Sequence, residues 1–253
     1  MTSDLRMRGL GQLTWNEFKL NLRDPLMVFW SLAFPTLWLV LMAAVLPGPI
    51  PGFTYEGLND ASFFLPAAIS LVILCASFIG VPLTLTTYRE TAVLRRLRVT
   101  PVKTSTLVLS FSISQFAFVV VGIFILFVIG KIFFSIQVLG SLAAFIGVII
   151  LGMVVFLAIG SAVGSIARSF RAANIIIFTM FMPMIMLSEL FLPISILPAW
   201  LQPIAKALPL TPVNTMLRDI VYGVPLDDLW RLGVLAGWLV LGSLVTLKFF
   251  RWE

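Results

Sequence analysis

The sequence predicts an all-α, multi-pass membrane protein with six transmembrane helices. Apolar residues make up 60% of the 253 residues and charged residues only 11%, whereas soluble domains have about 25% charged residues. The mean hydropathy is +1.08, and several uncharged stretches exceed the roughly 20 residues that a spanning helix needs. The chain has no histidine and one cysteine, which excludes a disulfide framework, a Cys/His metal site and histidine-dependent catalysis. We therefore expect no catalytic and no metal-binding residues.

Charged residues and prolines delimit the six predicted spans. They are Met27–Leu46, Ser62–Thr87, Thr106–Gly130, Leu139–Ala167, Ala173–Phe191 and Leu229–Phe250. We interpret the chain as a single transmembrane domain, 1–253. Its parts are an interfacial helix within 1–26, spans one to five within 27–192, a proline-rich outer segment over 193–228, and the last span with its tail over 229–253. Arg231 and Lys248 lie near the two ends of the last span, from which their side chains can reach the interface.

The distribution of the cations predicts the orientation of the spans. An even number of spans places both termini on one side, and thirteen of the 17 lysines and arginines fall on that side. The other side has four, Lys131, Lys206, Arg218 and Arg231. Lysine and arginine are enriched in cytoplasmic loops. Both termini are therefore expected in the cytoplasm.

A helix is predicted before the first span. At helical spacing the segment has two stripes. The narrow polar stripe consists of Gln12, Asn16, Lys19 and Arg23, and the apolar stripe consists of Trp15, Phe18 and Leu22. Such a helix lies in the membrane interface. From the pattern alone it is either a simple anchor or a contact site for a partner.

The longest predicted cytoplasmic loop follows the second span and reads YRETAVLRRLRVTPV over Tyr88–Val102. On a helix its apolar residues share one side, its arginines surround them, and Pro101 ends the helix. The apolar residues are Val93, Leu94 and Leu97, and the arginines are Arg89, Arg95, Arg96 and Arg98. The pattern fits a basic helix that binds anionic lipid and equally a helix that docks into a groove of a cytosolic partner.

A proline-rich segment separates the fifth and sixth spans. Two short amphipathic pieces are predicted in it, Ala199–Ala207 and Pro212–Tyr222, the second with Thr211 as its N-cap and Gly223 just past its end. Helices this short cannot cross a bilayer, so we expect them to enter and return on the outer side, buried in protein. The alternative is an interfacial loop without a role in transport.

Two spans have side chains that could line a path through the membrane. In the fifth span six residues are predicted to share one face: Asn174, Phe178, Phe181, Met182, Ile185 and Glu189. Glu189 is singled out because an ionisable group at membrane depth is costly and usually functional. The second span has a polar stripe of Ser70, Ser77 and Thr84. Ordinary helix packing and bonding of the hydroxyls to their own helix backbone remain open for both sets.

Close helix packing is predicted where glycines are four residues apart. Gly160 and Gly164 lie in the fourth span, and Gly233 and Gly237 lie in the sixth. Such pairs let two backbones approach, most simply within one subunit; dimerisation through them is the alternative.

The order and spacing of these features resemble a known family of transporters. The loop YRETAVLRRLRVTPV and the segment FLPISILPAWLQPIAKALPLTPVNTMLRDI (Phe191–Ile220) are similar to the corresponding parts of type-2 ATP-binding-cassette permeases, which include the daunorubicin-resistance permeases. Thr91 stands where relatives often have glycine. The resemblance implies that Glu90–Arg98 form a coupling helix on an ATPase subunit, with the contacts made by Arg89, Glu90, Val93, Leu94, Arg95, Leu97 and Arg98. It also implies that the N-terminal helix touches the ATPase and that the outer helices cap the exit.

The same resemblance implies the function and the partners. The chain would be the permease subunit of an exporter in the cytoplasmic membrane of a prokaryote, paired with a second permease subunit, identical or related, and with two ATPase subunits. ATP and magnesium belong to the ATPase, because the only Gly-Lys pair, Gly130–Lys131, has Ile125 and Ile132 where a P-loop needs Gly and Ser or Thr. We expect no cofactor on this chain, contact with membrane lipids, and no nucleic acid. The methionines and phenylalanines of the fifth span favour an apolar or amphiphilic cargo such as a drug or lipid.

Two other functions are compatible with a polytopic membrane protein. A secondary transporter or channel would need several intramembrane charges or an inverted repeat, and only Glu189 approaches that. A lipid-modifying enzyme would need clustered ionisable groups at a membrane face, for which Asp227 and Asp228 are the nearest candidates.

Overall fold

The computed structural model describes residues 2–45, 61–91, 104–136, 138–191 and 193–249. In these ranges every regular element is a helix. Six of the described helical stretches are long and apolar enough to cross a membrane: Pro25–Val45, Ser62–Glu90, Leu109–Phe134, Leu142–Ile166, Phe170–Leu187 and Leu229–Phe249. The predicted fold class is confirmed.

Several span boundaries differ from the predicted ones by three residues or more. The third helix continues past Lys131 to Phe134, since one cation can extend from a helix end toward water. The fourth begins only at Leu142, where the Ser141 hydroxyl accepts a hydrogen bond from Ala144 N at 3.4 Å. The fifth helix begins three residues before the predicted Ala173, at Phe170, and ends at Leu187 instead of Phe191. Serine caps that the apolar pattern cannot reveal set both amino ends.

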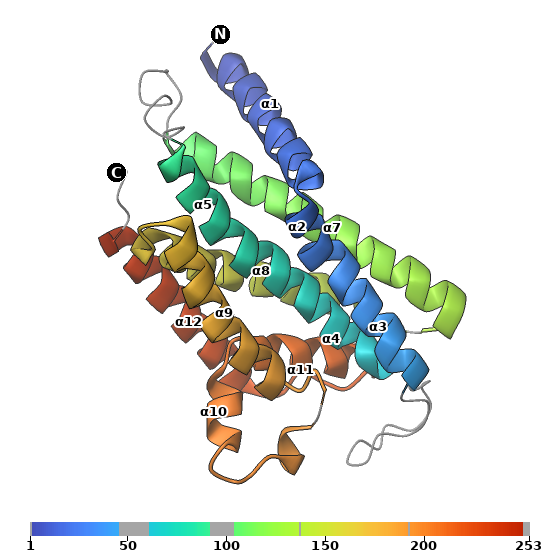
Figure 1. The fold of residues 1–253 in the computed structure, drawn as a ribbon. Coiled ribbons are helices and arrows are strands. Elements are labelled where there is room, and N and C mark those ends of the chain that lie inside the picture. The colour runs from blue at the N-terminus through green and yellow to red at the C-terminus, as the bar shows by residue number, and fades with distance from the viewer. Residues whose placement is uncertain (1, 46–60, 92–103, 137, 192, 250–253) are drawn as a thin grey trace.

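The elements follow the chain in a simple order (Figure 1). They are α1 (Thr2–Arg23), α2 (Pro25–Val28), η1 (Phe29–Ala33), α3 (Phe34–Val45), α4 (Ala61–Ile73), η2 (Leu74–Ile79), α5 (Gly80–Glu90), α7 (Thr104–Phe134), α8 (Leu142–Ile166), α9 (Phe170–Leu187), η3 (Ile194–Ile196), α10 (Gln202–Ala207), α11 (Leu210–Val221) and α12 (Leu229–Phe249). The first span is thus α2–η1–α3 and the second is α4–η2–α5.

A π-helical turn interrupts each of the first two spans, and the two turns, η1 and η2, lie in contact. A proline follows each turn, Pro35 after η1 and Pro82 after η2. A proline ring clashes with the carbonyl four residues earlier, which belongs to Ser31 in η1 and to Phe78 in η2. The wider π-helical turn accommodates the ring without breaking the span.

The second span lies at the centre of the bundle. Its most apolar stretch of 18 residues is completely buried, whereas only 11% of the corresponding stretch of the sixth span is buried. The end of α5 lies at the same end of the bundle as the start of α1 and the end of α12, and α10 and α11 lie at the opposite end (Figure 1). We call these the α5 end and the α11 end. The first, third, fourth and fifth spans surround the second.

The predicted close packing of glycines is confirmed in the fourth span and wrong in the sixth. A Cβ on Gly160 would lie 2.6 Å from the Ser77 carbonyl oxygen, and one on Gly164 would lie 3.1 Å from Pro82 Cα. Around Gly233 and Gly237 no described atom lies within 4 Å of the Cβ position. The sixth span instead approaches α8 through Gly242, which the i, i+4 pattern does not include.

The outer segment contains the two predicted short helices with shifted bounds. The first, α10, begins only at Gln202 and ends at Ala207. The second, α11, begins at Leu210, so the predicted N-cap Thr211 lies inside the helix, where its hydroxyl donates to Ala205 O at 2.5 Å. All residues of α11 are buried, and Gly223 follows with a φ of 72°. Burial in protein agrees with the expectation; the position of α11 in a membrane stays a prediction.

Candidate functional site

Three consecutive residues at the end of the second span contact three different helices. Tyr88, Arg89 and Glu90 end α5, directly before the basic loop. Tyr88 contacts α1, Arg89 contacts the end of α8, and Glu90 contacts the start of α9. We call this triad the loop root.

Tyr88 connects the loop root to the N-terminal helix. Its hydroxyl lies 2.6 Å from both carboxylate oxygens of Glu17 and donates to them. Glu17 is only 6% exposed. Burial raises the pKa of the Glu17 carboxyl above its ordinary value, and the hydrogen bond from Tyr88 offsets part of that rise.

Arg89 and Glu90 connect the root to the junction between the fourth and fifth spans. Arg89 Nη1 donates to Gly164 O at 2.6 Å and to Ala167 O at 3.2 Å, at the carboxyl end of α8. A Glu90 carboxylate oxygen accepts from Phe170 N at 2.8 Å, at the amino end of α9. A cation at a helix carboxyl end and an anion at an amino end both complement the helix dipole. The loop root is therefore fixed to α8 and α9 by charge-assisted hydrogen bonds.

The structure places two of the seven predicted coupling residues, Arg89 and Glu90, in this triad. The others, Val93, Leu94, Arg95, Leu97 and Arg98, lie outside the described residues.

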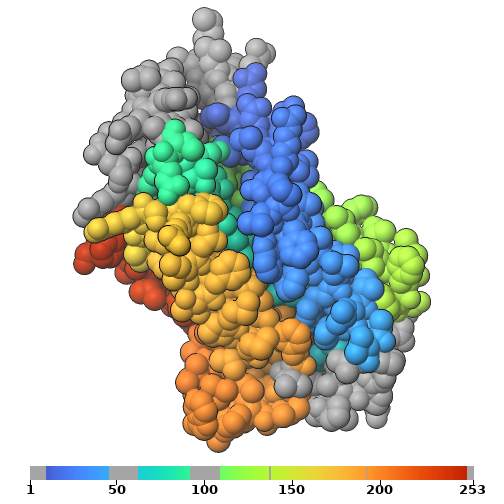
Figure 2. All heavy atoms as spheres, viewed as in Figure 1, coloured from blue at the N-terminus to red at the C-terminus, as the bar shows by residue number. Residues whose placement is uncertain are grey.

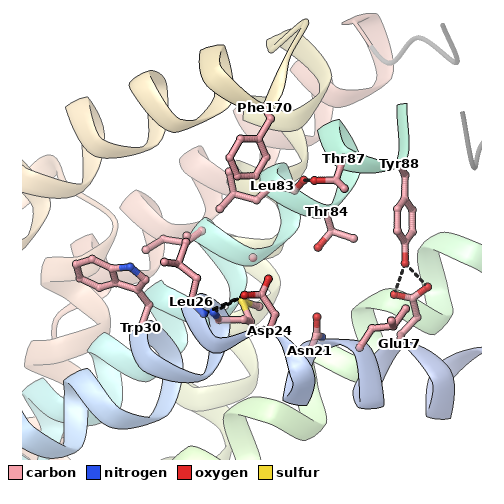
Figure 3. A pocket seen from close by; sticks show the side chains of 14 residues that line it. Glu17, Asn21, Asp24, Leu26, Trp30, Leu83, Thr84, Thr87, Tyr88 and Phe170 are labelled. Carbon is pink, nitrogen blue, oxygen red and sulfur yellow. Dashed lines mark hydrogen bonds between the residues drawn. The ribbon is translucent and has the colours of Figure 1, made fainter. Parts of the chain in front are cut away.

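A cavity of about 250 Å³ lies beside the loop root. Residues of α1, α2 and η1 form one wall, residues of η2 and α5 form the other, and Phe170 of α9 closes one side (Figure 3). In the space-filling view the region lies between the blue N-terminal helices and the yellow α9, with α5 behind them (Figure 2). The cavity therefore lies where the first, second and fifth spans meet.

The predicted polar stripe of the second span divides between the core and this cavity. Ser70 and Ser77 are fully buried, and neither hydroxyl has a hydrogen-bond partner among the described residues. Thr84 lines the cavity. The seven-residue spacing does not keep one direction because the π-helical turn η2 lies between Ser70 and Thr84.

The predicted face of the fifth span also divides. Phe181 and Ile185 are buried in the core, whereas Phe178 is 36% and Met182 50% exposed. The Asn174 amide donates to Phe170 O at 3.0 Å in its own helix. The rings of Phe178 and Phe181 lie 6.0 and 5.9 Å from the ring of Trp30, so an aromatic cluster joins α9 to the first span.

Glu189 lies past the carboxyl end of α9 and does not continue its face. Its φ of 57° is outside the helical range. The helical spacing on which the prediction relied therefore does not extend to Glu189. One carboxylate oxygen lies 2.5 Å from Arg218 Nη2 of α11 and the other accepts from Ile194 N at 3.0 Å. Asn214 of α11 donates to the carbonyls of Ser188 and Glu189. Glu189 thus holds the outer segment together at the α11 end.

Arg231 is also paired. It contacts Asp219 of α11 and lies 2.7 Å from Asp228, with its side chain 13% exposed. The expected extension from the start of the last span toward the interface is therefore wrong for this residue.

The N-terminal helix buries polar residues that belong to neither predicted stripe. Glu17 is buried, and Asn21, 7% exposed, donates to Ser114 Oγ of α7 at 3.2 Å. Trp15 and Leu22 of the predicted apolar stripe are 56% and 46% exposed. The four-residue spacing of Glu17 and Asn21 was a visible signal, and Asp24 before Pro25 was a second, typical of a helix start. Nothing in the sequence placed Trp30 at the cavity.

A comparison with known protein families gives one match. The model of the ABC-2 type transporter family matches residues 8–222, which include the described residues of the loop root, the cavity and α11. This family is one of membrane permease domains, which are transport subunits and not catalytic domains. No curated protein matches the chain.

Proposed function

This chain belongs to the family of ABC-2 type transporters, and we propose that it is the permease subunit of an ATP-driven exporter. A second permease subunit, identical or related, completes the pathway. Two separate ATPase subunits bind ATP and magnesium beneath it. The complex lies in the cytoplasmic membrane of a prokaryote, in contact with its lipids, with both termini of this chain in the cytoplasm. The daunorubicin-resistance permeases are the subgroup that its sequence resembles.

The loop root is the observation that carries this proposal. A transport subunit driven by another polypeptide needs a rigid connection from the docking site to the spans that move. Tyr88, Arg89 and Glu90 supply such a connection, because they adjoin the basic loop and contact α1, α8 and α9. A push on Glu90–Arg98 would therefore reach the second and fifth spans together. Closure of the ATPase pair would tilt these spans between inward-facing and outward-facing states.

The cargo is apolar or amphiphilic. The exposed face of α9 supports this proposal, since it contains Phe178, Met182 and Met186. Methionine is flexible and polarizable, so a surface rich in it adapts to varied apolar ligands. Four of the predicted path residues are partly or fully exposed: Thr84, Asn174, Phe178 and Met182.

Copurification with the ATPase tests the docking of the loop. Changing Leu94 and Leu97 to Asp removes the apolar side of the predicted helix and should abolish capture of the ATPase by the tagged permease in detergent or nanodiscs. Trp200→Asp is the matched control, because Trp200 is 70% exposed at the α11 end and its change should leave capture intact. Capture that survives the double substitution would contradict docking through this loop, and transport of a cargo without any ATPase would contradict the proposed function.

A further inference from the structure

The cavity beside the loop root is unusual in the chemistry of its lining. Two acidic residues, Glu17 and Asp24, line it, and no lysine or arginine is among the described lining residues. The loop that follows has five cations, so this acidic lining differs from its surroundings. A site lined by acidic groups and no cation favours a positively charged ligand over an anionic one.

Two oxygen atoms in the cavity, on Asn21 and Asp24, have no hydrogen-bond partner among the described residues. The Asn21 amide nitrogen is occupied by Ser114, and its oxygen accepts no hydrogen bond from the residues that the structure describes. Asp24 uses only Oδ1, which accepts from Leu26 N at 2.9 Å and from Met27 N at 3.3 Å. Figure 3 shows Asn21, Asp24 and Thr84 directed toward the same space. One of these acceptors is on a buried residue, Asn21, which is 7% exposed, and the other is on Asp24, which is exposed. Oxygen acceptors without a donor favour a ligand that brings positive charge.

Thr84 differs from the threonines that follow it in α5. Thr86 and Thr87 donate to the carbonyls of Pro82 and Leu83, four residues earlier, at 2.8 Å each. No such bond exists for the Thr84 hydroxyl among the described residues. Its hydroxyl is therefore available to a ligand.

The rest of the lining is apolar and aromatic. Leu26, Met27, Leu83 and Ile79 line the cavity together with the rings of Trp30 and Phe170. Aromatic faces attract cations as well as apolar groups. At about 250 Å³ the cavity is smaller than the 300–1,000 Å³ typical of sites for drug-sized ligands, so it fits the head of an amphiphile and the adjoining part of its tail.

We propose that this cavity binds the cationic head of an amphiphile, such as an alkylammonium group, against Asp24, Glu17, Asn21 and Thr84. That this ligand is a cargo loaded for transport rests on the proposed function; the binding itself does not. The site lies between α1, which bonds the loop root through Glu17, and the first, second and fifth spans. A ligand held there would contact α1, α5 and α9.

Binding of dodecyltrimethylammonium tests the site. Radiolabelled ligand is titrated onto the full-length permease in nanodiscs, without ATP or ATPase, and binding to empty nanodiscs is subtracted. Dodecyl sulfate, with the same tail and the opposite charge, is the competing probe. Asp24→Asn and Glu17→Gln keep the N-cap and the bond to Tyr88 while removing charge. Asp228→Asn at the α11 end is the matched control for loss of one acidic charge.

We expect saturable binding of the cation, no competition by dodecyl sulfate, and a loss of affinity of about tenfold or more in each cavity variant but not in Asp228→Asn. Equal competition by the anion, unchanged affinity in both cavity variants, or no binding above empty nanodiscs would overturn the inference. Because no ATPase takes part, these results are independent of the docking experiment. If the cation binds but does not stimulate the ATPase of the complex, the binding site is supported and its role in cargo loading is contradicted.

Discussion

Glu17 is a carboxylate that the fold buries in a helix with four cations, Arg6, Arg8, Lys19 and Arg23. Its single strong neighbour is the Tyr88 hydroxyl, 2.6 Å away, and the other acid of the cavity is Asp24. Its raised pKa means that the folded protein holds this proton more tightly than the unfolded chain. Stability must therefore decrease as pH rises between the unfolded and folded pKa values.

We predict that the contact between α1 and α5 becomes more stable as pH falls through the range just above 4.5, the ordinary pKa of a glutamate. Hydrogen exchange of α1 amides, measured against pH, should show this slope in the wild type. Glu17→Gln should lose it, because glutamine keeps the hydrogen bond but does not titrate. The same pH dependence in Glu17→Gln would contradict this prediction, because the slope would then come from other titrating groups.

Arg89 donates two hydrogen bonds from a charged group to the carboxyl end of α8. Each bond of this kind contributes about 1.5–3 kcal/mol. Arg89→Gln should therefore lower transport per ATP hydrolysed by about tenfold or more in proteoliposomes with the ATPase, while ATP hydrolysis continues. Arg171 is an exposed cation on the neighbouring helix α9. The control variant Arg171→Gln should leave the ratio of transport to ATP hydrolysis unchanged. A wild-type ratio in Arg89→Gln would remove Arg89 from the coupling route.

The pair of Glu189 and Arg218 is almost entirely buried, with side chains 10% and 8% exposed. Removing one partner of a buried ion pair costs about 3–5 kcal/mol, because the other charge stays buried. Arg218→Met should cause a loss of this size in unfolding experiments in detergent. Adding Glu189→Gln should recover much of it, since glutamine can still accept from Ile194 N. If the double variant is no more stable than Arg218→Met, the loss of stability comes from the packing of Arg218 over Phe63 and not from the ion pair.

At the scale of elements, the sequence predicted the existence of the helices better than their contacts. Long apolar stretches identify spans because a bilayer requires about 20 apolar residues. Which side of each span faces a neighbour is not encoded in that requirement. The two π-helical turns rotate the residues beyond them, so the stripe of Ser70, Ser77 and Thr84 was predicted on one face and is found on two.

Glycine spacing illustrates the same limit. Gly160–Gly164 and Gly233–Gly237 have the same pattern, yet only the first pair lies against another backbone. We predict that Gly160→Ala destabilises the protein by about 1–3 kcal/mol, because the added methyl group would lie against the Ser77 carbonyl. Gly237→Ala should be neutral or stabilising by up to about 1 kcal/mol, since alanine favours a helix. Equal effects in unfolding experiments would contradict the packing of α8 on the second span.

At the scale of the whole molecule, the loop root was only partly predictable. The resemblance to the family indicated Arg89 and Glu90, whereas Tyr88 was merely the first residue of the loop. Their partners are 71 to 80 residues away in the chain, and pairs at that separation cannot be read from local periodicity. The bundle brings them together because α1 and the junction of α8 and α9 each contact the end of α5.

The central claim is that the loop root transmits movement from an ATPase to the spans. Its most direct test is the distance between spin labels at Asn16 of α1 and Arg171 of α9, both exposed, in the reconstituted complex with the ATPase. Cys75 is the only cysteine and is buried, so introduced cysteines label selectively. The distance should change when ATP and magnesium are added to the wild type. It should stay constant in the triple variant Tyr88→Phe, Arg89→Gln, Glu90→Gln while ATP is still hydrolysed. The same ATP-dependent change in the triple variant would contradict the claim.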